Sequence, residues 1–426
     1  MKRSYYIIGL IFLTFFVISL LTNILGPIIP DIIKSFDLSL TLAALFPFSF
    51  FIAYGVMSIP SGMLVDKYKE KPVMGAAFLI AFAGAFLFAV TPSYSVAIIS
   101  LFLIGAGMAM LQVAINPLLR VAGGEEHFAF NSVFAQLIFG LASFLSPYIY
   151  SYLVRNIHQP VADKNFIITS LEKVVPVSLP WISLYWVFAF VAAIMVVLMF
   201  ASKFPEVQRK EDEVAGAWET HKNLFKEKTV ILYFIGVFAY VGTEQGVANW
   251  ISQFLYTYHG LDPQTAGAST VAWFWGMLTA GCLLGMVFLK FFDSRKVLLG
   301  FVISAIVWLS VAFFGSRAMA LIAFPMVGFS ASVMWSIVFS LALNSLDRHH
   351  GSFSGILCTA IIGGAIVPLV IGWLGDIFGL KYGMFFLYLT LGYIFSIGLW
   401  AKPIIANETI SMKKKKAEAV HEESNR

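Results

Sequence analysis

Twelve long apolar stretches fill almost the whole chain, and one charged segment divides them six and six. A helix that spans a bilayer needs about 20 mostly apolar residues, because hydrocarbon offers the backbone no hydrogen-bond partners. The composition agrees: 59% of residues are hydrophobic and 12% are charged, which suits a chain surrounded by lipid and not one dissolved in water. The sequence therefore predicts an all-α membrane protein whose function lies between its helices.

The predicted spans have the length of one bilayer crossing each, with ends that are approximate. They cover residues 5–29, 40–64, 72–90, 96–119, 128–153, 181–200, 230–256, 265–288, 297–314, 318–343, 354–374 and 383–401.

The longest polar interruption is the segment 203–228. It predicts a six-helix bundle at 1–202, a cytoplasmic central loop at 203–228, a second six-helix bundle at 229–402 and a disordered basic tail at 403–426. Two bundles of equal span count are typical of transporters, in which one bundle rocks against the other around a site near the bilayer midplane.

The distribution of lysine and arginine predicts the orientation. With the N-terminus on the cytoplasmic side, only six of the 28 basic residues fall outside. Cytoplasmic loops carry an excess of lysine and arginine. Both termini are therefore expected on the cytoplasmic side of a bacterial inner membrane. The net charge of +5 is mainly this topological bias, and we expect no nucleic-acid partner. A monomer in the bilayer is expected.

The loop between the second and third spans carries the sharpest motif, which runs from Gly62 through Asp66 and Lys67. Glycine permits close helix approach, and an acidic residue can receive a helix N-terminus or a basic partner. The stretch from Gly285 to Asp293 repeats glycine, acid and base at the same place in the second half, although both loops could simply carry inside-positive charge. The motif resembles the signature loop of the major facilitator superfamily. The resemblance implies that superfamily's fold, with twelve transmembrane helices in two pseudo-symmetric six-helix bundles and a cytoplasmic gate at Asp66 and Lys67.

Two further stretches narrow the resemblance. The fourth span contains LQVAINPLLR at 111–120, and the seventh contains YVGTEQ at 240–245. Both are similar to the fucose–proton symporter family of sugar transporters. This likeness implies uptake of a monosaccharide by symport with a cation, and Arg120 at the end of the fourth span is a further gate candidate.

The chain departs from that family where coupling chemistry is expected. Several members have an acidic residue just before the proline of the first span, where this chain has Gly26 before Pro27. The family's acidic residue in the fourth span is matched by Gln112. The family's glutamine in the fifth span aligns with Phe134, although Gln136 lies nearby. Because an amide cannot take up and release a proton, the coupling ion is open between H+ and Na+.

Glu244 in the seventh span is the main candidate for cation coupling. A carboxylate far from the ends of a span is costly in lipid, so it usually faces a cavity or a partner. Glu244 could carry a proton, or it could join Thr243 in a sodium site. The alternative is a structural role, in which the carboxyl group is neutralised by a hydrogen bond between helices.

Sugar binding requires amides and hydroxyls for hydrogen bonds and aromatic faces for the apolar side of the ring. Gln112 and Asn116 are four residues apart and share one helical face, and Gln245 and Asn249 repeat this spacing. Each amide could instead join two helices, and each tryptophan could belong to the interfacial belt. The predicted substrate-binding set is Asn23, Gln112, Asn116, Gln136, Gln245, Asn249, Trp250 and Trp335.

Nothing in the sequence indicates an enzyme. It contains no nucleotide-binding glycine loop, no paired histidines at metal spacing and no convincing nucleophile triad, so no cofactor is expected. The sequence favours a secondary transporter that imports a monosaccharide with a cation by alternating access. A proton-driven exporter of amphipathic compounds and a non-transporting sugar sensor are the alternatives.

Overall fold

The computed structural model describes residues 5–123, 128–160, 164–204, 218–346 and 350–404, and within these ranges the chain is helical without strands. Twelve helical segments are long and apolar enough to cross a membrane, six before the central segment and six after it. The prediction of twelve spans is confirmed. Most of the predicted central loop and nearly all of the basic tail lie outside the described residues.

The first half of the chain consists of six spans and one short helix that lies outside them. Its helices are α1 (Tyr5–Thr22), α2 (Leu25–Phe36), α3 (Leu40–Tyr68), α4 (Glu70–Val90), α5 (Tyr94–Gly123), α6 (Phe128–Asn156), α7 (Phe166–Glu172), the 3-10 turn η2 (Pro180–Ile182) and α8 (Ser183–Ala201).

The second half follows a short connecting helix, α9 (Trp218–Leu224). Its elements are α10 (Lys228–His259), the π turn η4 (Pro263–Gly267), α11 (Ala268–Phe291), α12 (Ser294–Phe314), α13 (Arg317–Ala331), α14 (Met334–Leu343), α15 (His350–Thr359), the 3-10 turn η5 (Ala360–Ile362), α16 (Gly363–Phe378), α17 (Leu380–Met384) and α18 (Phe386–Trp400).

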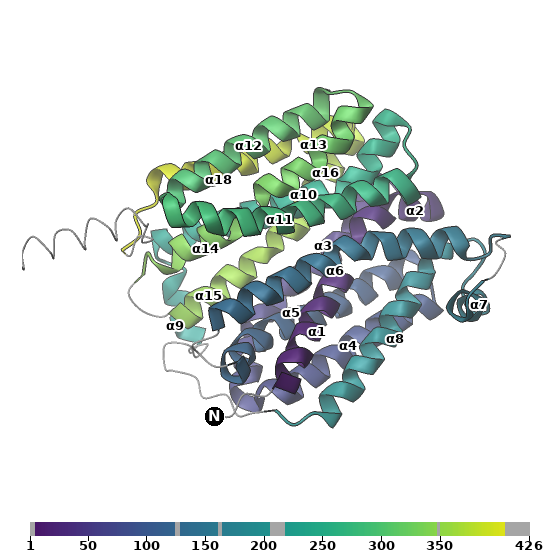
Figure 1. The fold of residues 1–426 in the computed structure, drawn as a ribbon, viewed down its shortest axis with the longest axis horizontal. Helices are drawn as coiled ribbons and strands as arrows, with labels where there is room; N and C mark the ends of the chain where they lie inside the picture. Colours follow the sequence, from purple (N-terminus) through teal and green to yellow (C-terminus); the bar gives the residue numbers. More distant parts are fainter. Residues whose placement is uncertain (1–4, 124–127, 161–163, 205–217, 347–349, 405–426) are drawn as a thin grey trace, which may run out of the picture.

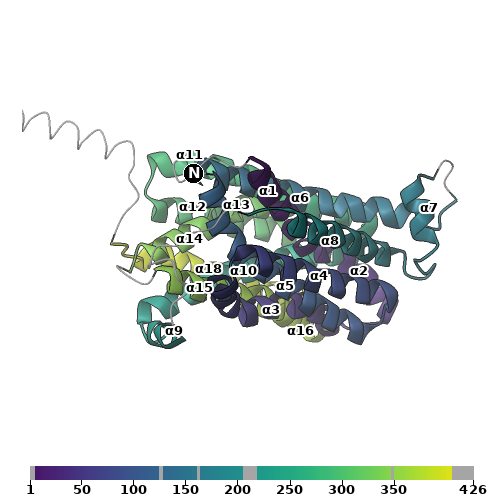
Figure 2. The same cartoon turned by 90° about the horizontal axis from the view of Figure 1, so that it is seen from below.

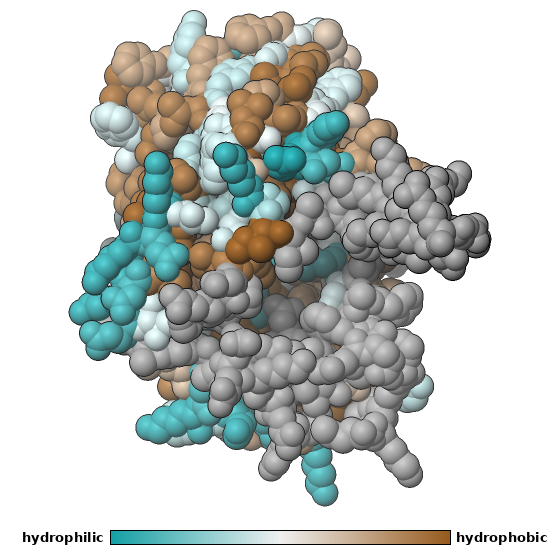
Figure 3. All heavy atoms as spheres, turned by 90° about the vertical axis from the view of Figure 1, so that its left-hand side faces the viewer, coloured by the Kyte–Doolittle hydropathy of each residue, from teal (hydrophilic) through white to brown (hydrophobic). Residues whose placement is uncertain are grey.

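The two halves lie side by side with their helices running along the long axis of the molecule (Figure 1). We call the two ends of this axis by the short helices that mark them. The α9 end holds the start of α1, and the α7 end holds α2 and α7; the view from below shows the same arrangement (Figure 2). Hydrophilic side chains gather on the α9 end (Figure 3).

Polar residues set where several spans begin. Ser39 and Ser316 accept hydrogen bonds from backbone N–H groups in the first turns of α3 and α13, and Asp293 does so for α12. Such caps satisfy amides that have no partner inside the helix. The spans themselves expose large apolar side chains, for example Phe190 at 67% and Leu389 at 67%, which a bilayer would cover.

Three spans are broken in mid-course. The first is interrupted at Asn23 and Ile24, between α1 and α2. Pro27 lacks the N–H group that would bond the carbonyl of Asn23, so the helix cannot run regularly through this point. The tenth span breaks between α13 and α14, and the eleventh passes through the 3-10 turn η5.

The two halves meet mainly where α3 packs on α15 and α16, where α6 packs on α11, and where α2 packs on α10. Glycine permits close approach of the two backbones where α2 meets α10. A Cβ atom on Gly26 of α2 would lie 2.2 Å from the carbonyl oxygen of Ala248 on α10, so a larger residue there would push the halves apart.

Candidate functional site

A cavity of about 640 Å³ lies between the two halves. The first half contributes side chains from α1, α3, α5 and α6, and the second from α10, α11, α14 and the helix breaks. The lining continues to Leu289 in α11 and to Leu343 and Asn344 at the end of α14. The cavity therefore extends from the middle of the molecule toward the α9 end.

The three broken spans contribute their breaks to the cavity wall. Asn23 from the first span, Ser332 and Val333 from the tenth, and Ile361 from the eleventh all line it. Interrupted helices at membrane depth are found where their freed backbone groups face a cavity or a ligand. The breaks of the first, tenth and eleventh spans therefore all face this cavity.

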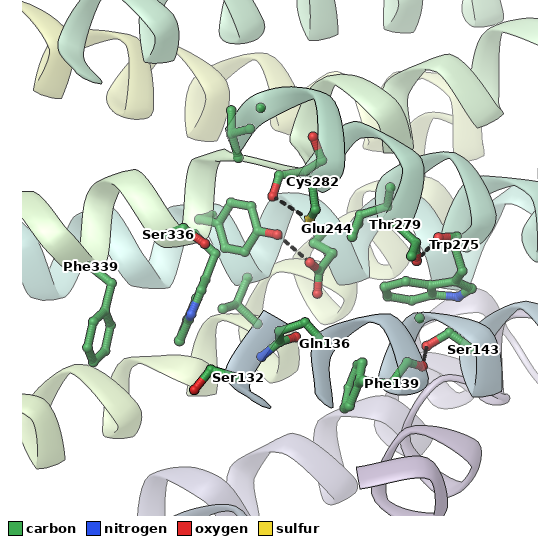
Figure 4. A pocket seen from close by; sticks show the side chains of 18 of the residues that line it. Ser132, Gln136, Phe139, Ser143, Glu244, Trp275, Thr279, Cys282, Ser336 and Phe339 are labelled. Atoms are coloured by element: carbon green, nitrogen blue, oxygen red, sulfur yellow. Dashed lines mark hydrogen bonds between the residues drawn. The ribbon is translucent and has the colours of Figure 1, made fainter. Parts of the chain in front are cut away.

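Glu244 lies on α10 and is half-buried in the cavity wall (Figure 4). Its Oε2 atom accepts a hydrogen bond of 2.5 Å from the Tyr240 hydroxyl, one helical turn earlier, and its Oε1 atom accepts one of 3.2 Å from the Gln245 amide. Among the residues that the structure describes, no lysine or arginine forms an ion pair with this carboxyl group. Glu244 is therefore held by neutral hydrogen-bond donors at membrane depth.

The cavity brings together four of the predicted amides. Gln112 on α5 and Gln136 on α6 line the side formed by the first half, and Gln136 lies opposite Glu244 (Figure 4). Gln245 is almost fully buried beside the carboxyl group. Asn23 lines the cavity and donates a 2.8 Å hydrogen bond to Ser143 Oγ on α6.

An aromatic wall borders the same space. Trp335 is stacked on Phe339, with ring centroids 5.4 Å apart and an angle of 26° between the planes, and the tilted ring of Tyr240 lies 5.9 Å from that of Trp335. All three line the cavity. Flat aromatic faces beside hydrogen-bonding groups suit a ligand with both polar and apolar surfaces.

The sequence analysis missed a polar stripe in the tenth span. Ser332, Ser336, Ser340 and Asn344 recur at every fourth residue and all line the cavity. This spacing puts side chains on one helical face, so the pattern was a usable signal. Tyr240 was detectable in the same way, because it lies four residues before Glu244.

Three predicted residues lie elsewhere. Asn249 is buried against the backbone of α2 at the α7 end, and Trp250 donates a 3.2 Å hydrogen bond to the carbonyl of Pro368. The Thr243 hydroxyl is 2.6 Å from that of Thr390 on α18. None of the three lines the cavity. Asn249 is one helical turn from Gln245, but its depth along α10 puts it where the halves are closed.

The predicted gate residues lie at the α9 end of the first half. Asp66 is half-buried in the last turn of α3, and the Lys67 ammonium lies 5.0 Å from the ring of Tyr68. The side chains of Arg120 and of the predicted binding residue Asn116 lie outside the described part of the structure.

The corresponding loop of the second half is tied down internally. Asp293 caps α12 and accepts a 3.2 Å hydrogen bond from Arg295 Nε, whose guanidinium group also donates to the Ala401 carbonyl. Partial burial raises the pKa of Asp293, but the hydrogen bonds from Arg295 outweigh it and hold that pKa below its usual range.

A helical fold of twelve spans around a central cavity, whose lining includes amides, hydroxyls and aromatic rings, defines a multi-pass membrane transporter and not an enzyme. The sequence profile of the Major Facilitator Superfamily matches residues 11–361. The chain belongs to this superfamily, which confirms the resemblance of its loop motif.

The relatives with assigned roles are sugar transporters. The glucose/galactose transporter of Brucella abortus is 32% identical over 91% of this chain and 92% of its own length. The L-fucose-proton symporter of Escherichia coli is 26% identical over 89% of each chain. A crystal structure of the E. coli fucose:proton symporter matches the fold with a TM-score of 0.67 at 22% identity, over 94% of this chain and 100% of that one.

Proposed function

We propose that this protein imports a hexose together with a proton. The observation that carries the proposal is a carboxyl group without a described counter-ion, Glu244, in the wall of a cavity that also presents amides, hydroxyls and stacked aromatic rings. The relatives named as transporters of glucose and galactose support a hexose as the cargo.

The sugar would bind between the amides and the aromatic wall. Gln112 and Gln136 on one side and Gln245 on the other supply donors and acceptors for hydroxyl groups. The indole of Trp335 offers a face for the apolar side of the sugar ring. A cavity of about 640 Å³ is in the range of sites that enclose a small ligand.

Glu244 would carry the coupling proton. A negative charge without a cation is costly at membrane depth, and a bound proton removes that cost. A sodium ion would instead need several oxygen ligands, and the nearest hydroxyl that was predicted to help, Thr243, is bonded to Thr390 and the Ala239 carbonyl. The position of Thr243 favours H+ over Na+, and the named role of the E. coli symporter agrees with this choice.

The transport cycle would be alternating access by two rocking bundles, residues 1–202 and 229–402. We place the α9 end on the cytoplasmic side of a bacterial inner membrane, because this end holds most of the basic residues. The structure then corresponds to the state in which the cavity faces the cytoplasm and the outer end is closed. The residues at the α9 end, including Asp66 and Lys67, would close in the opposite state.

The test is uptake of labelled glucose, galactose, mannose and fucose into proteoliposomes, under an imposed proton gradient and separately under a sodium gradient. The proposal predicts accumulation of at least one hexose under the proton gradient. Accumulation under the sodium gradient alone would reject the proton as the coupling ion. Sugar binding without any flux would identify a sensor, and proton-driven extrusion of amphipathic dyes without sugar flux would identify an exporter.

A further inference from the structure

The Asp376 carboxylate joins the two halves at the α7 end through three hydrogen bonds. Asp376 is in the last turns of α16, in the second half, and its side chain lies against the first turn of α3, in the first half. Its Oδ1 atom accepts a 2.8 Å hydrogen bond from the Leu40 N–H, and its Oδ2 atom accepts one of 2.9 Å from the Thr41 N–H and one of 2.5 Å from the Thr41 hydroxyl.

These bonds complete the cap of α3. The first amides of a helix have no partner inside it and carry the positive end of the helix dipole. The cap residue of α3, Ser39, accepts only a weak 3.3 Å bond from Leu42. Asp376 therefore supplies, from the other half, acceptors for the Leu40 and Thr41 amides that α3 does not supply itself. Hydrogen bonds to a charged acceptor are about twice as strong as neutral ones.

Small residues bring the two helices into this contact. A Cβ atom on Gly372, one turn before Asp376, would lie 2.7 Å from the Leu40 carbonyl oxygen and 3.0 Å from the Ala44 side chain. Gly375 likewise lies against the Leu40 side chain. The glycine face of α16 therefore seats the start of α3, and the carboxylate fixes it there.

Weaker bonds accompany this contact at the same end. Gln264 of the second half donates 3.4 Å and 3.5 Å hydrogen bonds to Asp31 of the first, and the hydroxyls of Tyr148 and Ser269 lie 3.3 Å apart. These distances are at the long limit for hydrogen bonds. The hydrogen bonds that Asp376 accepts are shorter than these bonds.

We propose that Asp376 is a latch that holds the α7 end closed while the cavity faces the α9 end. Opening the α7 end separates α3 from α16, so the Asp376 carboxylate must then exchange the amides of Leu40 and Thr41 for water. The latch thus sets the balance between the two transport states. It presupposes the alternating access proposed above, but testing it requires neither a sugar nor an ion gradient.

The test measures the width of the α7 end by pulsed electron spin resonance. Spin labels are placed on Ser93→Cys in the first half and Ala318→Cys in the second, both exposed at this end, in a chain with Cys282→Ala and Cys358→Ala. Asp376→Asn puts an amide NH2 group against the N–H groups of α3 and removes the charge. We expect the fraction of molecules with the longer label-to-label distance to be about tenfold larger than in the labelled protein that keeps Asp376. An unchanged distance distribution would overturn the latch.

Two further variants keep the result interpretable. Glu172→Gln is the matched control, because Glu172 is also a carboxylate at the α7 end and its hydrogen bonds among the described residues, to Lys164 and the His158 backbone, stay within the first half. It should leave the distances unchanged. Thr41→Val removes only the hydroxyl bond, so it should cause a smaller shift in the same direction and carries the test if Asp376→Asn fails to fold. A failure of sugar uptake would leave these distances unaffected, so the two proposals fail independently.

Discussion

The two ends of the molecule show two ways of arranging the same pair of halves. At the α7 end, backbones touch across glycine, as at Gly26, and one carboxylate, Asp376, caps a helix of the opposite half. Toward the α9 end, the same halves enclose a cavity lined by apolar side chains and by amides, hydroxyls and one carboxyl group. A closed end built from close contacts and a few hydrogen bonds can reopen at moderate cost, because opening rehydrates only a few polar groups.

The antiparallel helices α3 and α16 share one sequence pattern near their C-terminal ends, which lie at opposite ends of the molecule. Both end in the pattern glycine, any residue, leucine, any residue, aspartate: Gly62 to Asp66 in α3 and Gly372 to Asp376 in α16. The two aspartates therefore lie at opposite ends of the molecule. In this state the aspartate of α16 is bonded across the interface at the closed end.

The largest effect is expected from Glu244→Gln, which removes the carboxyl group from the open cavity but keeps its size. The variant cannot carry a proton, so the internal sugar concentration should no longer exceed the external one. Exchange of labelled for unlabelled sugar should continue, because it needs no net proton movement. Uphill uptake and exchange measured in the same proteoliposomes check this, and retained accumulation would contradict it.

The contrast between cavity and closed end can be tested along one helix face of α10. Gln245→Leu removes a cavity amide and should raise the KM for sugar about tenfold, since one lost hydrogen bond to a ligand is worth about 1 to 2 kcal/mol. Asn249→Leu, one turn further on, changes a buried amide that does not line the cavity and should leave KM unchanged. A similar KM increase in both variants would show that the cavity reaches further than described.

A smaller effect is expected from Gly26→Ala. The added methyl group would lie 2.2 Å from the Ala248 carbonyl oxygen and must force α2 away from α10, at a cost of about 1 to 3 kcal/mol to the closed α7 end. Gly9→Ala is the control, because a Cβ on Gly9 meets no atom within 4 Å. Thermal unfolding in detergent should separate the two variants, and equal melting temperatures would show that the contact is not tight.

The smallest effect is expected at the α9 end, from Arg295→Gln. The pair of Arg295 and Asp293 is partly exposed, with side chains 41% and 26% accessible, so its loss should cost less than about 1 kcal/mol. The pKa of Asp293 is lower in the folded protein than in the unfolded chain. The pair therefore stabilises the fold at pH values above the usual aspartate pKa, and this contribution is lost as the pH falls through the lowered pKa. The difference in melting temperature should therefore shrink on acidification.

The sequence predicted the spans well, because a bilayer crossing imposes a long apolar run that few other structures need. It also singled out Glu244, since an acid inside such a run is conspicuous. The first span was predicted to end at residue 29, but its helical segment continues to Phe36. The charged residues Asp31 and Lys34 resemble the start of a loop. The position of a residue along the helix axis was harder to predict. Helical spacing cannot show that Asn249 lies beyond the cavity.

The sequence did not indicate which residues the Asp376 carboxylate contacts. Asp376 ends an apolar run and resembles any solvated charge at the end of a span, and its partners Leu40 and Thr41 are more than 330 residues away in the sequence. Only the packing of α16 on α3 brings them together. The serine stripe of the tenth span, by contrast, was visible in the sequence as polar residues at every fourth position.

The most direct test of the central claim is proton movement on addition of sugar. Proteoliposomes in weak buffer, with a pH-sensitive dye outside, receive a transported hexose without any imposed gradient. We expect alkalinisation of the outside medium that depends on the sugar and is absent in Glu244→Gln. Sugar flux without a pH change, or an equal pH change in the Glu244→Gln variant, would contradict it.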